Sequence, residues 1–225
     1  MTVTLDDIYQ RLYDVYGPQD WWPAESPFEV MVGAILVQNT AWTNAERAIQ
    51  NLRDADLLSV DRLYAVPLAE LESMIRSAGY YRMKTRRLRN LLDHLVEYHE
   101  GSIDLFFELD TETLRQELLS INGIGPETAD SILLYAAERP VFVVDSYTSR
   151  VLKRHRWIEN DADYDVLQSH FHTHLEPDVS LYNEFHALIV RIGHLHCRKT
   201  PRCEECPLEQ WIPEGGICLP EKQRP

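Results

Sequence analysis

The sequence predicts an all-α protein, and three observations support this fold class. Apolar residues recur at spacings of three and four, as in the stripe formed by Leu88, Leu91, Leu92 and Leu95, which is the period of a helix with one buried face. The two-residue alternation typical of half-buried strands is nearly absent. Helix-start signals precede several apolar stretches; Ser26-Pro27, for example, offers a capping serine and then a proline at the first helical position.

The same signals place the individual helices. Thr4 can cap the first helix, which Gly17-Pro18 ends. Pro126 begins a helix that we expect to continue to about Arg139-Pro140, where the second proline blocks it. Long internal repeats are absent from the sequence, which excludes a repeat architecture. The other expected helices begin near Pro27, Thr43, Ser59, Pro67, Tyr81 and Thr111, and three more cover about 146–154, 163–174 and 179–195.

The composition is that of a folded protein outside the membrane. Of 225 residues, 44% are hydrophobic and 26% are charged, so the chain can bury a substantial core. No apolar run reaches the length of a membrane span, and the first residues lack the basic start and apolar core of a signal peptide. We therefore expect a cytoplasmic monomer.

The stretch from Leu118 to Arg154 carries the strongest functional signal. A tight turn containing Gly123 and Gly125 is followed by a proline-started helix, and the glycines can take positive φ and admit another backbone. Backbone N–H groups at such a turn and helix start form an anion site, which suits a nucleic-acid phosphate. Asp145 precedes the next expected helix, where it can serve as an N-cap.

Taken together, the turn, its helix and Asp145 resemble the helix-hairpin-helix with downstream Gly/Pro and Asp of the endonuclease III and adenine glycosylase superfamily of DNA repair enzymes. The resemblance implies that Asp145 is catalytic and that Gly123 and Gly125 contact double-stranded damaged DNA, near the nucleoid. It also implies two helical lobes. One is a six-helix barrel with the helix-hairpin-helix at 23–138; the other joins 1–22 to 139–225 and ends in a four-cysteine loop.

The net charge of −14 opposes binding to DNA, but the positive residues are grouped. One group lies at 82–89, where five cations occur without an acid, and another lies close to the cysteines. Each group alone is typical of a solvated helix face; beside the motifs above they indicate DNA contacts, for which we select Lys84, Arg198 and Lys199. The three groups are 82–89; Arg150, Lys153 and Arg154; and Arg198, Lys199 and Arg202.

All four cysteines lie in the last 29 residues, with the spacing C-x5-C-x2-C-x11-C. Clustered thiols in a cytosolic chain indicate a metal site rather than disulfides. Zinc and a [4Fe–4S] cluster both accept four cysteines, and the uneven spacing suits the cluster at least as well. The resemblance favours [4Fe–4S], since many members carry one with the spacing C-x6-C-x2-C-x5-C. The expected ligands are Cys197, Cys203, Cys206 and Cys218.

Bifunctional members of the resembled superfamily place a lysine in the hairpin helix, which attacks the sugar and allows strand cleavage. Glu127 stands at that position in this sequence. A carboxylate cannot form a Schiff base, so lyase activity by this route should be weak or absent. Asp145 can still stabilise positive charge on the sugar and activate water, which predicts monofunctional hydrolysis.

Three tryptophans suggest the base that is removed. A single carboxylate without an evident general acid favours a good leaving group such as a cationic alkylated purine, and tryptophan is the best aromatic wall for a cation. Trp21, Trp22 and Trp42 are thus candidates for a flipped-base pocket, although each could equally be a core residue. Trp-Trp-Pro and an aromatic after Gln-Asn-Thr are similar to the 3-methyladenine DNA glycosylase III branch. Leu188 departs from that branch, which has a lysine there.

Two further residues are candidates for contacts with the distorted duplex. Asn39 matches the position at which endonuclease III inserts a glutamine into the gap left by the flipped base. Tyr80 matches its wedge position, and a tyrosine can stack between bases. A half-buried aromatic at a helix start is the alternative for Tyr80.

Three functions remain open from the sequence. The first is a DNA glycosylase for alkylated purines. The second is an endonuclease III-like glycosylase for oxidised pyrimidines with weak or no lyase activity. The third is a catalytically silent protein that binds damaged DNA. Glu127 and the tryptophans favour the first over the second, and Asp145 in its intact context favours an enzyme over the third.

Overall fold

The computed structural model describes residues 3–219, and every regular element in that range is a helix, which confirms the all-α class. The chain forms two compact units. The hairpin unit is Trp22–Arg139, and the cysteine unit joins the chain up to Trp21 with the chain from Pro140 onward. None of the helices between residues 3 and 219 combines the length and apolarity that crossing a membrane requires.

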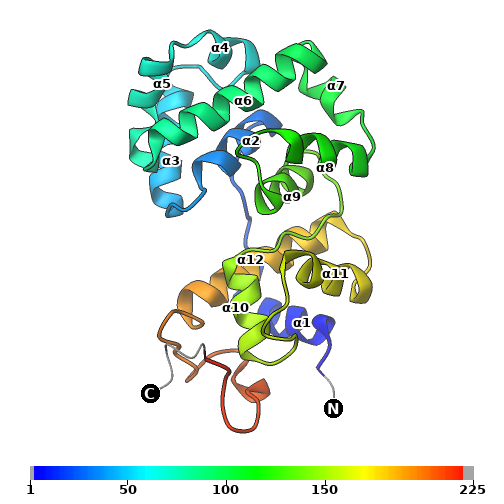
Figure 1. Ribbon diagram of the computed structural model, residues 1–225. Helices are drawn as coiled ribbons and strands as arrows, with labels where there is room; N and C mark the ends of the chain where they lie inside the picture. The colour runs from blue at the N-terminus through cyan, green and yellow to red at the C-terminus, as the bar shows by residue number, and fades with distance from the viewer. Residues whose placement is uncertain (1–2, 220–225) are drawn as a thin grey trace. The chain divides into compact units, whose positions relative to one another are not determined.

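The hairpin unit has eight α-helices and one short 3-10 helix in the described chain (Figure 1). The resemblance implied six helices in this unit; of the eight, α4, α5 and α7 are short helices of five to seven residues. The elements are α2 (Pro27–Leu36), α3 (Trp42–Asp54), α4 (Val60–Ala65), α5 (Leu68–Met74), η1 (Arg76–Ala78), α6 (Tyr81–His99), α7 (Ile103–Phe107), α8 (Thr111–Ser120) and α9 (Pro126–Tyr135).

Helix α2 is the central helix of this unit. The Ser26 hydroxyl accepts a hydrogen bond from the Glu29 N–H at 3.2 Å, and Pro27 occupies the first turn. Every residue from Phe28 to Leu36 is buried, and α2 packs against α3, α6 and α9. Burying each large apolar side chain of such a helix contributes roughly 1.5–3 kcal/mol, so α2 holds the surrounding helices in place.

Helices α8 and α9 form the predicted helical hairpin (Figure 1). Asp110 caps α8 by accepting from two backbone N–H groups. Further along α8, Arg115 forms a two-pronged ion pair with Asp130 of α9: Nε donates to Oδ1 at 2.7 Å and a terminal nitrogen donates to Oδ2 at 3.1 Å. The Asp130 side chain is 0% exposed, so this pair fixes the two helices against each other in a water-free setting.

The cysteine unit is built around α12. Thr4 and Asp7 form a capping box at the start of α1, and α12 packs against both α1 and α10. Its core is aromatic: the rings of Phe142 and Phe171 stack with centroids 3.7 Å apart, and Phe185 packs edge-on to both. The elements are α1 (Leu5–Tyr16), α10 (Ser146–Arg154), α11 (Tyr164–His174), α12 (Val179–Leu195) and the 3-10 helix η2 (Glu209–Trp211).

Two elements differ from the sequence prediction. Helix α9 ends at Tyr135, before the expected stop at Arg139-Pro140. Backbone N–H groups of Ala137 and Arg139 turn back to carbonyls of α9, and Glu138 takes a left-handed φ of 51°, which is a C-terminal cap without glycine. Helix α7 was not expected, because five residues are too few to show a periodic pattern.

Candidate active site and cysteine cluster

Asp145 is the N-cap of α10. The buried segment Val141–Val144 leads into it, and its side chain is only 12% exposed. Oδ1 accepts hydrogen bonds from the Thr148 N–H at 2.7 Å and the Thr148 hydroxyl at 2.9 Å. Oδ2 instead faces Nε2 of His186 at 3.8 Å, which is beyond hydrogen-bond reach. The cap therefore uses one carboxylate oxygen and leaves the other for a further interaction.

His186, on α12, was not found from the sequence. Its side chain is buried, and burial lowers the pKa of the imidazole while the Asp145 carboxylate acts in the opposite direction. The indole of Trp21 meets this ring edge-on at 6.1 Å. Nε1 of Trp21 is buried without a hydrogen-bond partner among residues 3–219. An unsatisfied buried donor is uncommon in a folded protein.

The other two predicted pocket tryptophans lie together in the hairpin unit. The Trp22 ring stacks on Tyr135 at 5.1 Å and meets Trp42 edge-on at 5.5 Å. A Cβ placed on Gly33 of α2 would lie 3.4 Å from the Trp22 ring, so the indole packs closely on this backbone. All three rings remain partly exposed. The structure thus brings Trp22 and Trp42 together and adds Tyr135, which sequence reasoning missed.

The turn between α8 and α9 uses its two glycines differently. Gly123 has a φ of 101°, and a side chain there would collide with Arg87, so glycine is required for both reasons. Gly125 has a φ of −100°, and the expectation of a positive φ was wrong for this residue. It caps α9 in an extended conformation, with open space where a Cβ would be and no side chain bonded to the helix start. The backbone at Gly125 is therefore open to an approaching group.

Gln38, just after α2, ties this turn to the centre of the unit. Its Nε2 donates to the Gly123 carbonyl at 3.1 Å and to the Thr128 hydroxyl at 2.8 Å, while its carbonyl oxygen accepts from Arg87. The sequence indicated only that amides gather near this point. Gln38 thereby holds the loop that carries Asn39 against the hairpin.

The predicted duplex-contacting residues Asn39 and Tyr80 both lie at the surface. Asn39 is exposed and has a left-handed φ of 52°. Tyr80 has a φ of 45°, precedes α6 as its N-cap, and is 66% exposed. A large aromatic side chain held away from the core is available for stacking, whereas the half-buried alternative does not apply. Nearby, the Thr40 hydroxyl donates to the Ala78 carbonyl at 2.6 Å and links the two loops.

Lys84 does not reach the solvent, and its selection as a DNA contact was wrong. It is 1% exposed, and its ammonium group donates to the carbonyls of Leu36 and Ala78, both at 2.7 Å. Burial, aided by the positive charge of Arg87, lowers the pKa of Lys84 to about 8. Lys84 therefore fastens the end of α2 to the start of α6.

The second positive group is likewise used within the protein. Arg150 donates to the carbonyl of Cys197 at 2.5 Å, Lys153 to that of Ala162 at 2.7 Å, and the buried Arg154 to those of residues 198 and 199. In contrast, the side chains of Arg198 and Lys199 are exposed. The buried Arg154 thus shapes the loop that presents these two cations to solvent.

Cys197 and Cys218, the first and last cysteines, both contact Arg154. A guanidinium nitrogen of Arg154 lies 3.4 Å from Cys197 Sγ, and the Cys218 N–H donates to the Arg154 carbonyl at 2.9 Å. Asn160 lies beside Cys218, with Nδ2 3.1 Å from its sulfur. Despite the long last gap in the sequence, Cys218 is therefore anchored to the same helix end as Cys197.

Three of the cysteines lie near one another in a partly buried region. Burial, with a smaller contribution from the neighbouring Cys203 and Cys197, raises the pKa of Cys206 to about 11. With zinc–sulfur bonds of about 2.3 Å, tetrahedral zinc would bring its sulfurs to about 3.8 Å from one another. Within residues 3–219 no three cysteine sulfurs lie within 4.8 Å of one another. The four sulfur ligands are compatible with either zinc or an iron–sulfur cluster.

Glu127 lies in the first turn of α9 and is exposed. Its carbonyl accepts from the Ser131 hydroxyl at 2.7 Å. A carboxylate near a helix N-terminus is stabilised by the helix dipole. The position expected to carry an amine in bifunctional relatives is therefore acidic and accessible in this protein.

The sequence pattern of the HhH-GPD superfamily, base excision DNA repair proteins, matches residues 32–177. Because the match covers well over half of the chain, this protein belongs to the HhH-GPD superfamily of base excision repair DNA glycosylases. The matched region contains the α8–α9 hairpin, Glu127 and Asp145.

Similarity to individual proteins extends over most of the chain. The protein is 47% identical over 205 residues to "Putative DNA repair glycosylase MJ1434" of Methanocaldococcus jannaschii, which covers 91% of this chain and 93% of that protein. It is 30% identical over 194 residues to endonuclease III of Bacillus subtilis, with 84% and 82% covered. Among solved structures, the H. pylori 3-methyladenine DNA glycosylase MagIII bound to 1,N6-ethenoadenine superposes with a TM-score of 0.74. It is 28% identical and covers 85% of this chain and 98% of its own.

Proposed function

We propose that this protein is a monofunctional DNA N-glycosylase that removes alkylated purine bases from double-stranded DNA. The observation that carries the proposal is the geometry of Asp145. Its Oδ1 is held by Thr148, while Oδ2 makes no hydrogen bond to the described residues and lies 3.8 Å from Nε2 of His186, in a site that is only slightly exposed to solvent. A carboxylate fixed through one oxygen suits a reaction in which positive charge develops on a sugar.

In the proposed reaction, water attacks C1′ of the deoxyribose and the bond between C1′ and the base nitrogen breaks. The base leaves with the bonding electron pair, so a purine that is cationic through alkylation departs as a neutral molecule and needs no proton from the enzyme. Asp145 offsets the positive charge on the sugar and receives the proton of the attacking water. Nε2 of His186 lies 3.8 Å from Oδ2 of Asp145, and burial lowers the pKa of this imidazole, which favours its neutral form beside the carboxylate.

The aromatic residues support a preference for alkylated purines. Trp22, Trp42 and Tyr135 offer electron-rich faces within one contact group, and such faces attract a cationic ring. The buried Nε1 of Trp21 lacks a partner among the described residues and would donate a hydrogen bond to a base acceptor. The similarity to MagIII, whose solved complex contains an alkylated-adenine analogue, points the same way.

Glu127 supports water attack over lyase chemistry. An amine must attack C1′ to give a Schiff base, and at this position the protein has a carboxylate. The only lysine inside the expected basic helix, Lys84, is buried and bonded to two carbonyls, so it is not available as a nucleophile. The proposed product is an intact abasic site.

Several described surfaces suit DNA. The open backbone at Gly125 and the uncapped start of α9 offer N–H groups to a phosphate. Asn39 and Tyr80 are exposed and could fill the gap and wedge the duplex. Arg198 and Lys199 add exposed positive charge. With a net charge of −14, non-specific binding should be weak and easily lost to added salt.

Cys197, Cys203, Cys206 and Cys218 would hold a [4Fe–4S] cluster. When bound, the cluster supplies a structural crosslink, and its positive iron would stabilise thiolates whose pKa values burial raises. Arg154 bonds both to Cys197 and to the carbonyls of Arg198 and Lys199. The cysteine segment would thereby set the position of the two exposed cations.

A panel of damaged duplexes tests the proposal. Separate duplexes carry 3-methyladenine, thymine glycol or 8-oxoguanine opposite adenine, and each is incubated with the enzyme and then divided for alkali treatment. Release of 3-methyladenine, with strand breaks only after alkali, is expected. The 30% identity to a B. subtilis endonuclease III makes oxidised pyrimidines the second candidate; selective excision of thymine glycol would establish it instead. Binding to damaged duplexes without any excision would show a catalytically silent protein.

A further inference from the structure

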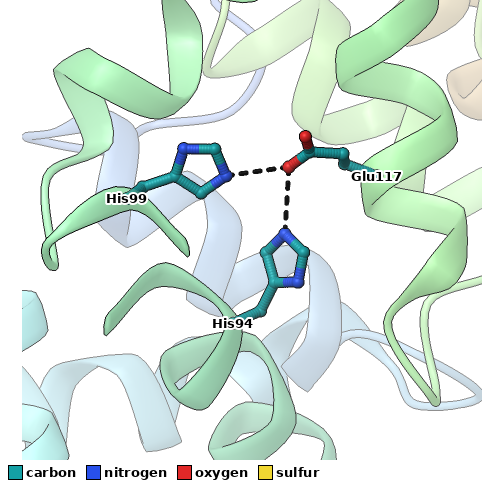
Figure 2. A group of neighbouring side chains, drawn as sticks. All are labelled: His94, His99 and Glu117. Carbon is teal, nitrogen blue, oxygen red and sulfur yellow. Dashed lines mark hydrogen bonds and ion pairs between the residues drawn. The ribbon is translucent and has the colours of Figure 1, made fainter. Parts of the chain in front are cut away.

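A group of three metal-ligand side chains lies in the hairpin unit, apart from every residue assigned to base excision. Figure 2 shows the rings of His94 and His99 turned toward one carboxylate oxygen of Glu117. His94 Nε2 lies 3.1 Å and His99 Nε2 2.8 Å from Glu117 Oε2. All three ligand atoms lie within 4.8 Å of one another. Both histidines belong to the C-terminal part of α6, and Glu117 belongs to α8.

Packing holds the two rings in this orientation. Phe106 of α7 contacts both, with ring centroids 4.7 Å from His99 and 5.8 Å from His94, and Tyr98 packs on His94 at 5.0 Å. The histidine side chains are 10% and 14% exposed, whereas Glu117 is 32% exposed. The group is therefore a fixed pair of imidazoles beneath a carboxylate that still reaches water, which leaves room for a solvent ligand.

The electrostatics of the group suit a cation. The Glu117 carboxylate oxygen lies within hydrogen-bond distance of Nε2 of both His94 and His99, so the three ligand atoms converge on one place. Each hydrogen bond to this oxygen places a proton on Nε2 of its histidine. A metal ion between the three side chains would take the place of these two protons and bind both Nε2 atoms and Oε2 of Glu117.

We propose that His94, His99 and Glu117 form a binding site for a divalent transition-metal ion of the zinc type, with water completing the coordination. Two imidazoles and one carboxylate are the protein ligands of zinc sites that keep an open position. The donor set differs from that of the cysteines, which offer only sulfur. The site is also independent of the proposed excision reaction, since none of its residues is assigned a role there.

Binding at this point would reinforce the helical hairpin. Asn90, one turn before His94 on α6, donates to the Asn122 carbonyl in the α8–α9 turn at 2.8 Å. A metal that joins α6 to α8 would act beside this contact and favour the folded state through ligand linkage. At about 100 times the dissociation constant, the melting temperature should rise by about 5–10 °C.

Cobalt(II) titration of the full-length protein tests the site, because cobalt replaces zinc and reports its ligands by colour. Nitrogen and oxygen ligands give weak visible bands, whereas thiolate ligands add strong near-ultraviolet charge-transfer absorption. The titration is compared among wild type, His94→Asn, His99→Asn and Glu117→Gln. The matched control is His170→Asn, from the His170–His174 ring pair on α11.

The expected result is one equivalent of cobalt bound without thiolate absorption. Each of the three site variants should weaken this binding by at least about tenfold, and His170→Asn should leave it unchanged. His99→Asn is the most buried of the substitutions; if it fails to fold, Glu117→Gln tests the site with both rings in place. Cobalt binding with thiolate absorption, equal binding by wild type and Glu117→Gln, or no binding at all would overturn the proposal.

Discussion

Replacing Asp145 by asparagine tests the proposed reaction sharply, because it removes one charge and little else. Asparagine is as good an N-cap as aspartate, so its side-chain oxygen can still accept from the Thr148 N–H, as Asp145 Oδ1 does at 2.7 Å. The lost interaction between the carboxylate and the helix dipole should lower stability by no more than about 1 kcal/mol. The variant is therefore expected to fold and to bind DNA.

The effect on excision follows from the charge and its surroundings. With an effective dielectric constant of about 20, a carboxylate about 4 Å from the developing positive charge stabilises it by about 4 kcal/mol. Because the Asp145 side chain is only 12% exposed, the effective dielectric constant around it should be below that of bulk water. Since each factor of ten corresponds to about 1.4 kcal/mol, Asp145→Asn should slow excision by about two to four orders of magnitude.

The measurement is single-turnover release of 3-methyladenine from a duplex, followed by chromatography of the free base. Binding to an uncleavable abasic duplex analogue serves as the check that the variant still recognises DNA. Thr148→Val is the matched control: it removes the hydroxyl bond to Asp145 Oδ1 but keeps the backbone bond and the free Oδ2, and it should retain excision to within about tenfold. Excision by Asp145→Asn at nearly the wild-type rate would show that Asp145 is only a helix cap.

Four further predictions follow from the same structure. Borohydride should trap no covalent DNA adduct with wild type but a weak one with Glu127→Lys; efficient wild-type trapping would refute water attack. The purified protein should be brown through an iron–sulfur cluster, and Cys203→Ser should bleach it; a colourless protein with one bound zinc would contradict this. Arg115→Met should lower the free energy of unfolding by about 3 kcal/mol, because it leaves the Asp130 carboxylate buried without its guanidinium, and adding Asp130→Asn should recover part of the loss in denaturant titrations. The pKa of Lys84 falls to about 8 in the folded protein, so this residue binds more protons in the unfolded chain between about pH 8 and 10.4. The stability of wild type relative to Lys84→Met should therefore rise with pH through that window. A stability difference that does not change with pH would show that the ammonium group is in solvent.

Helix starts could be predicted from the sequence because their causes are local. Thr4, Ser26 and Asp110 each bond to N–H groups two or three residues away, so a few neighbouring letters contain the whole interaction. The same holds for Asp145, whose cap partner is three residues further on. The helices over 146–154 and 179–195 therefore match their predicted ranges.

Several helix ends could not be predicted, because the residue that takes the left-handed conformation is not a glycine. Asp56, Glu100, Glu138 and Arg156 all take left-handed φ values between 51° and 58° after helices. A glutamate, aspartate or arginine in that conformation is strained, so the local sequence alone does not favour these turns. Packing of the rest of the chain determines these turns, and pattern reasoning extended α9 past its end for this reason.

Lys84 shows an error that the sequence could have prevented. It was grouped with its basic neighbours by charge, but it stands four residues before Leu88 and seven before Leu91, on the apolar stripe of the same helix. Helical position thus outweighs local charge in deciding exposure. In the structure the lysine is buried with the leucines, and two backbone carbonyls compensate its ammonium group.

The surroundings of the candidate site depend on contacts between distant residues. His186 lies 41 positions after Asp145, and Gln38 lies 85 positions before Gly123, with which it bonds. Each has an unremarkable local setting: His186 stands within a mostly apolar helix, and Gln38 follows one. No periodic or spacing rule links such pairs, so only the folded chain reveals them.

The two interpretations of Asp145, helix cap and catalytic carboxylate, are compatible in this geometry. Capping needs one acceptor oxygen, and Oδ1 accepts both bonds from Thr148. This fixes the plane and direction of the carboxylate, so Oδ2 has a defined position with little freedom left to lose when a substrate approaches. A carboxylate that was not a cap would have to be ordered during each reaction. The cap is therefore the structural reason why a single aspartate could suffice for the proposed chemistry.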